Sequence, residues 1–97
     1  MAEKRVTVLA RLKIKKGMEE EVKRGFLSVV ASTRKEPGCL NYDLHQSKDD
    51  PCLFMLYENW ESQKALDDHL KGIKAHLAKT AEASAVPPDI TLWEKIA

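Results

Sequence analysis

The sequence has 97 residues, which at roughly 100–200 residues per domain predicts a single domain over residues 1–97. Hydrophobic residues make up 43% of the chain and charged residues 32%, a balance typical of a folded globular protein rather than a disordered one. The formal net charge of +1 lacks the basic excess of nucleic-acid-binding proteins, so we expect no nucleic-acid partner. The longest apolar run, residues 52–57, is too short to span a membrane, and no secretory signal is visible at the N-terminus.

The first third of the chain reads as a strand followed by a helix. Residues 5–15 alternate between apolar and polar side chains, which predicts a strand with one face on a core. Lys16-Gly17 ends the strand, and the three glutamates at 19–21 favour the positive end of a helix dipole. Apolar residues at helical spacing then continue the helix to about Lys35, where Glu36-Pro37-Gly38 stops it.

Two strands and a long helical region follow. Strands are predicted at 39–47 and 52–60, around a turn at 48–51 that contains aspartates and a proline. The second of these strands is mostly apolar on both faces, so we expect it to be buried on both sides. Ser62 is a plausible N-cap for a helix that buries Leu66, His69 and Leu70, is bent or interrupted at Gly72, and continues to about residue 83.

The chain closes on a last predicted strand that contains Ile90, Leu92 and Ile96, after the break at 86–88. The order βαββαβ is that of ferredoxin-like α+β folds, in which helices cover one face of an antiparallel sheet. We expect Leu9 and Tyr57 on the uncovered face, together with Trp93. An exposed apolar patch of this kind usually marks an interface, so we expect a homodimer packed sheet to sheet.

The two cysteines do not form a predicted disulfide. Pairing of the two strands around the turn puts Cys39 and Cys52 at opposite ends of the hairpin, roughly 25 Å apart. Free thiols fit a reducing cytoplasm, which is the location that we expect.

Residues 36–69 contain several short motifs in a defined order. They are Glu36-Pro37-Gly38-Cys39-Leu40, Tyr42, Leu44-His45-Gln46-Ser47, Asp49-Asp50-Pro51, Tyr57-Glu58, Trp60, Ser62 and His69. Together with the Lys-Gly break before the first helix, their order and spacing resemble the antibiotic biosynthesis monooxygenase domain family, small dimeric α+β barrel proteins that include quinol monooxygenases. The similarity covers residues 6–96.

This resemblance implies the oxidation of an electron-rich phenol or quinol by O₂ without flavin, haem or metal. The expected partners are therefore a small aromatic substrate, O₂ and a second copy of the chain, with no cofactor. Such chemistry requires an apolar pocket with few polar groups, one that favours the substrate anion and excludes water.

His69 and Trp60 are the catalytic candidates. His69 lies on the inward stripe of the second helical region, and an imidazole suits proton transfer near neutral pH. The spacing between Trp60 and His69 is also part of the family resemblance. A histidine satisfied by a backbone carbonyl and a tryptophan that only fills the core are the structural alternatives.

Five further residues are predicted to bind the substrate. They are Phe26, Tyr42, Phe54, Leu56 and Glu58. The Tyr42 phenol is placed to donate to a substrate oxygen, or else to make a structural hydrogen bond. Glu58 shares a strand face with Trp60, and a buried carboxylate needs a partner. A structural ion pair is the interpretation that we favour for Glu58, ahead of a base or an acceptor for His69.

Other functions on the same scaffold stay open. One is haem binding or degradation, in which His76 would approach the metal, although His69 and Ala10 replace the Trp and Asn of that branch. An isomerase and a non-catalytic dimer that binds a small molecule are the others. A metal site made of His45, His69 and His76 is not expected, because His45 should point to the opposite face of the sheet.

Overall fold

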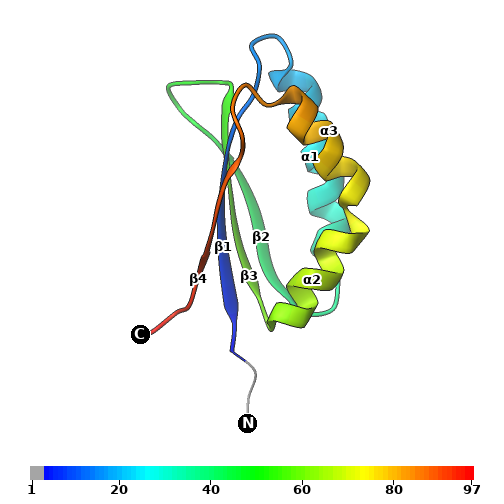
Figure 1. Cartoon of the computed structure of the whole chain (residues 1–97), viewed down its shortest axis with the longest axis vertical. Helices are drawn as coiled ribbons and strands as arrows, with labels where there is room; N and C mark the ends of the chain where they lie inside the picture. Colours follow the sequence, from blue (N-terminus) through cyan, green and yellow to red (C-terminus); the bar gives the residue numbers. More distant parts are fainter. Residues whose placement is uncertain (1–3) are drawn as a thin grey trace.

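The computed structural model describes residues 4–97 and contains four strands and three helices (Figure 1). In chain order these are β1 (Val6–Lys13), α1 (Glu19–Thr33), β2 (Cys39–Gln46), β3 (Leu53–Trp60), α2 (Gln63–Gly72), α3 (Lys74–Ala83) and β4 (Asp89–Trp93). No helix of residues 4–97 combines the length and the apolar character that crossing a membrane requires.

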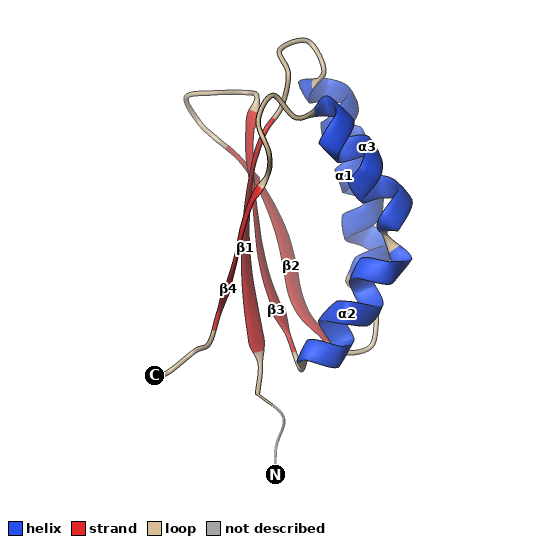
Figure 2. Ribbon diagram, in the orientation of Figure 1, coloured by secondary structure: helices blue, strands red, loops and turns tan. Residues whose placement is uncertain are grey.

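The strands form one antiparallel sheet in the order β2-β3-β1-β4, and all three helices lie on the same side of it (Figure 2). The predicted ferredoxin-like α+β fold is therefore confirmed. The second helical region is two helices, because Ile73 leaves the helical conformation after Gly72. Its amide still donates to the His69 carbonyl, so the chain bends at this point without separating the helices.

Element ends differ from the predicted ones by a few residues. The first helix ends at Thr33 instead of Lys35, because its last turn tightens before Pro37: the amides of Lys35 and Glu36 bond carbonyls three residues back. The last strand stops at Trp93, so the prediction that it contains Ile96 is wrong. Ile96 is 92% exposed and pairs with no strand of residues 4–97.

The core lies between the helices and the face of the sheet that they cover. Alternate residues of β1 are buried there, namely Val8, Ala10 and Leu12, and α1 adds Val22, Phe26 and Val30. Full burial of each large apolar side chain stabilises the fold by about 1.5–3 kcal/mol.

The other face of the sheet is not covered by the helices, and some of its apolar side chains are exposed to solvent. Leu9 pairs with Tyr57 on this face, and Trp93 pairs with Thr7. Tyr57 is 41% exposed and Trp93 57% exposed. The expectation that the third strand is buried on both sides is therefore wrong for the single chain, since this sheet face has no second layer.

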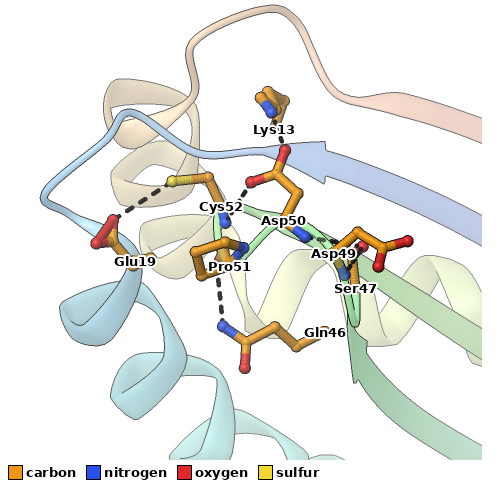
Figure 3. Close-up of polar contacts among 8 residues, drawn as sticks. All are labelled: Lys13, Glu19, Gln46, Ser47, Asp49, Asp50, Pro51 and Cys52. Carbon is orange, nitrogen blue, oxygen red and sulfur yellow. Dashed lines mark hydrogen bonds and ion pairs between the residues drawn. The ribbon is translucent and has the colours of Figure 1, made fainter.

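The turn between β2 and β3 is fixed by polar contacts (Figure 3). The Ser47 hydroxyl accepts hydrogen bonds from the amides of Asp49 and Asp50, and Asp50 in turn accepts from the Cys52 amide at 2.9 Å. The Asp50 carboxylate also pairs with Lys13 of β1. These bonds hold the turn against β1 and set the register of the hairpin.

Both cysteines are free, as predicted. Cys39 pairs with Trp60 at one end of β3, and Cys52 precedes the other end. Burial and the Glu19 carboxylate, which accepts from Cys52 Sγ at 3.4 Å, raise the pKa of the Cys52 thiol (Figure 3). Burial also raises the pKa of Cys39, so neither thiol has the lowered pKa of a reactive nucleophile.

Candidate functional site

His69 is the centre of the candidate site and is only 1% exposed. The Ser62 hydroxyl caps α2 by accepting from the Ala65 amide at 3.2 Å, which fixes where the helix begins. Leu66 and His69 lie three residues apart on the buried face of this helix. The imidazole is thus carried inward by the same periodicity that packs α2 against the sheet.

Glu36, in the turn between α1 and β2, binds the His69 ring. Its two carboxylate oxygens lie 3.0 and 3.2 Å from Nδ1. A carboxylate accepts hydrogen bonds, so Nδ1 carries the hydrogen and Nε2 is left with its lone pair. Within residues 4–97, Nε2 has no hydrogen-bond partner. This is the tautomer that a general base requires.

Two aromatic rings pack against the imidazole. The centroid of Trp60 lies 4.6 Å from that of His69 with the planes tilted by 32°, and Tyr42 meets the imidazole edge-on at 5.3 Å. Tyr42 and Trp60 also contact each other, with centroids 6.4 Å apart. The histidine is therefore held by its ring faces as well as by Glu36.

Glu58 is buried and accepts a hydrogen bond from the Trp60 indole at 2.9 Å. The ion pair expected for Glu58 is absent, because no basic side chain of residues 4–97 lies within salt-bridge distance. Burial raises the pKa of Glu58 to about 7, although the Trp60 hydrogen bond lowers it in part. Glu58 can therefore exchange a proton at neutral pH.

Tyr42 lies opposite Glu58 in the register between β2 and β3. Burial raises the pKa of the Tyr42 phenol above its ordinary value, and the neighbouring Glu58 carboxylate raises it further. The hydroxyl thus stays protonated and has no hydrogen-bond acceptor among residues 4–97. It is a donor available to a ligand.

A cavity of about 100 Å³ lies between the sheet and the helices, and every strand and helix contributes to its lining. Five of the predicted site residues line it: Phe26, Tyr42, Leu56, Glu58 and His69. Most of the remaining lining is aliphatic, so the polar groups are concentrated on Tyr42, Glu58 and His69.

Two predicted site residues lie outside the lining of this cavity. Trp60 is fully buried and does not line the cavity, but it contacts two residues that do, Glu58 and His69. Phe54 borders a different groove, with Leu27 and Leu44. Phe54 points to the helix side of the sheet as expected, but at the end where β3 packs against α1.

Glu36 is a candidate functional residue that the sequence analysis did not identify. It lies 33 positions before His69, so no helical or strand periodicity connects the two residues. The available signal was the Pro37-Gly38 turn, because a tight turn there brings Glu36 back to α2.

The other two histidines lie elsewhere. His45 is exposed on β2, three residues beyond Tyr42 and so on the opposite face of the sheet. His76 of α3 packs edge-on against Phe26, with centroids 4.5 Å apart, and lines a groove of about 270 Å³ that also touches α1. Burial lowers the pKa of His76, which favours its neutral form.

Comparison with known proteins identifies the fold and the family. The model of the family described as antibiotic biosynthesis monooxygenase matches residues 5–83. The crystal structure of PA3566 from Pseudomonas aeruginosa is 30% identical, covers 100% of this chain and 99% of its own, and superposes with a TM-score of 0.88. Rv0793 from Mycobacterium tuberculosis superposes with a TM-score of 0.89 at 26% identity, covering 96% of both chains.

Curated relatives extend beyond the region that they share with this chain. An uncharacterised protein of Synechocystis, sll1783, is 25% identical over 91 residues, and Rv0793, provisionally named a monooxygenase, is 34% identical over 64 residues. These matches span 92% and 66% of this chain but only 62% of each relative. A structure described as an antibiotic biosynthesis monooxygenase is 26% identical, with a TM-score of 0.89, and covers 95% of this chain and 99% of its own. The chain therefore belongs to the antibiotic biosynthesis monooxygenase family.

Proposed function

We propose that this protein is a monooxygenase that oxidises a hydroxylated aromatic compound of the quinol or phenol type with O₂, without flavin, haem or metal. The observation that carries the proposal is His69, held by Glu36 at Nδ1 with Nε2 free beside an apolar cavity. The family and the monooxygenase names among its relatives support the reaction type. The substrate class and the independence from cofactors are what the family resemblance implies, and the mostly apolar cavity with few polar groups is compatible with both.

The first step is removal of a proton from the substrate hydroxyl. His69 Nε2 accepts this proton, and the Glu36 carboxylate stabilises the imidazolium that forms. The protonated Tyr42 phenol donates a hydrogen bond to the substrate oxygen. The resulting phenolate gives up an electron more readily than the phenol does.

The phenolate then passes one electron to O₂, and the two radicals form a C–O bond at a ring carbon that bears hydrogen. The O–O bond of this peroxide breaks with loss of that hydrogen, one oxygen leaving as water and the other remaining as a carbonyl. One hydroxyarene and one O₂ thus give one quinone and one water. Glu58, with its pKa raised to about 7, is the second group that can deliver or accept a proton.

The experiment is O₂ uptake by chelator-treated protein with a reduced naphthoquinol as substrate. We expect uptake well above the non-enzymatic rate and one O₂ consumed per quinone formed. His69→Ala should lower kcat by about 100-fold or more, because it removes the general base. His45→Ala is the matched control and should keep wild-type activity, since His45 is exposed on the other face of the sheet.

Two outcomes would count against the proposal. If a panel of quinols gives no uptake above background but still binds, the protein is a binding module rather than an enzyme. If uptake appears only after a metal or flavin is added, cofactor independence is wrong. Haem is disfavoured as a ligand because His69 and Ala10 stand where the haem-degrading branch has Trp and Asn, so we expect a haem titration to leave the Soret band of free haem unshifted.

We also propose that the protein acts as a homodimer, packed through the sheet face that the helices leave open. The partly exposed side chains of Leu9, Tyr57 and Trp93 on that face support this arrangement. The polar residues beside them already bond one another, because the Asn59 amide donates to Asn41 and the Thr7 hydroxyl to Asn59. Removing this face from water therefore breaks few hydrogen bonds between its polar side chains and solvent.

A further inference from the structure

The cavity continues onto four exposed leucine and isoleucine side chains, which we call the apolar rim. They are Leu70 of α2, Leu77 of α3, and Ile90 and Leu92 of β4. All four line the cavity, yet they are 42%, 38%, 56% and 56% exposed, respectively. The sequence predicted Leu70 to be buried, but no helix covers β4, so the helix side of the sheet stays open there.

The cavity is too small to enclose a whole substrate. Its volume is about 100 Å³, with the apolar rim included in its lining. A cavity of about 150 Å³ holds one benzene molecule, and ligand sites usually enclose about 300–1,000 Å³. A ligand whose hydroxyl reaches His69 must therefore extend outward through the opening between α2, α3 and β4.

The two ends of this path differ in chemistry. Tyr42, Glu58 and His69 supply the polar groups of the inner end, whereas the rim is aliphatic. We propose that the rim is the binding site for a hydrocarbon substituent of the substrate, which would be a hydroxylated aromatic ring system that carries an apolar chain. The identity of the ring rests on the proposed function, and the site for the chain rests on the continuity of rim and cavity.

The rim is separate from the face assigned to the dimer. Ile90 pairs with Ala10 and Leu92 with Val8, both of which are buried under the helices. Trp93, the neighbour of Leu92, points to the other side of the sheet with Thr7 and Leu9. Dimerisation through that other side would leave the rim uncovered by the second copy. The rim is therefore available to the ligand.

The inference is tested by the binding of 4-alkylphenols, from 4-methylphenol to 4-hexylphenol, measured by calorimetry without O₂. Each methylene that is buried on the rim should raise the affinity by up to about fourfold, equivalent to about 0.8 kcal/mol. In Leu70→Ser and Leu92→Ser this dependence on chain length should flatten. Leu27→Ser is the control, since Leu27 is an equally exposed leucine on α1 and lies outside the rim.

Affinity independent of chain length in the wild type would overturn the inference, and so would equal chain-length dependence in the rim variants and Leu27→Ser. Dissociation of a dimer by Leu92→Ser would also overturn it, because the rim would then be an interface between subunits. These phenols report binding without turnover, which separates the two proposals. Chain-dependent binding without quinol oxidation would contradict only the monooxygenase proposal, whereas oxidation without chain dependence would contradict only the rim.

Discussion

At the scale of single residues, the Glu36–His69 pair determines what the site can do. A histidine beside an apolar cavity has two tautomers, and only the one with a lone pair on Nε2 takes a proton from the cavity side. The carboxylate at 3.0 Å from Nδ1 selects that tautomer and fixes the ring. Glu36 is one-third exposed, so the pair connects the buried ring to solvent.

Replacement of Glu36 by alanine should therefore affect catalysis more than binding. We expect kcat to fall by roughly 100-fold, the size of effect that about 1 Å of misplacement produces, while KM changes little. Nitrogen NMR of the His69 ring should show a single Nδ1–H tautomer in the wild type and a mixture in Glu36→Ala. Glu36→Gln should keep the tautomer, since its amide oxygen also accepts from Nδ1. An unchanged NMR signature in Glu36→Ala would refute the positioning role.

Glu58 predicts a pH dependence of stability. Folding raises its pKa from 4.5 to about 7, so its contribution is fully present below pH 4.5 and is lost as the pH rises to about 7. At 1.36 kcal/mol per unit the loss is at most about 3 kcal/mol. Glu58→Gln cannot ionise and still accepts from Trp60, so its free energy of unfolding should exceed that of the wild type at pH 8 but not at pH 4.

Urea unfolding at a series of pH values measures this difference. Glu61→Gln is the control, because Glu61 is an exposed carboxylate close to Glu58 in the chain. A constant difference between wild type and Glu58→Gln from pH 4 to pH 8 would mean that folding does not shift the pKa of Glu58.

At the scale of the elements, Gly38 lies where the turn before β2 packs against the start of α2. Its φ is +85°, and a Cβ atom there would lie 2.5 Å from the Cβ of Ala65. The Gly38 carbonyl also accepts from the Glu61 amide at 2.8 Å. Glycine thus permits the close approach that brings Glu36 within reach of His69.

Gly38→Ala should lower the free energy of unfolding by about 2–4 kcal/mol, combining the strain of a positive φ with the cost of overpacking. Gly17→Ala is a matched control, because Gly17 also has a positive φ, of +97°, but no atom lies within 4 Å of an added Cβ. It should cost only about 1–2 kcal/mol. Equal losses in the two variants would show that the contact with Ala65 does not constrain the fold.

The elements were predictable from local patterns, and the contacts between them were not. Alternation identified β1, helical spacing identified the buried Phe26 and His69, and the order of elements gave the fold. The Glu36–His69 bond depends on how the turn meets α2, which no periodicity encodes. The exposure of Leu70 likewise depends on the uncovered β4, a property of tertiary packing.

At the scale of the whole molecule, the small chain must form both a core and a cavity. A domain of this length buries only about 60–70% of its unfolded surface, so space left open between the sheet and the helices reduces its stability. Burial of the open sheet face by a second copy would compensate for that loss. A stable interface of this kind buries about 1,200–2,000 Å² in total.

Sedimentation velocity at micromolar concentration should therefore show a dimer. Tyr57→Asp should shift it to monomer, because a charge would be buried opposite Leu9 at the centre of the face. Leu27→Asp adds the same charge at an exposed position of α1, on the helix side of the sheet, and should leave the dimer intact. The dimer also predicts lower stability for the Tyr57→Asp monomer in urea, since the subunits then lose their shared layer. A monomeric wild type would leave the sheet face without a partner and contradict the dimer proposal.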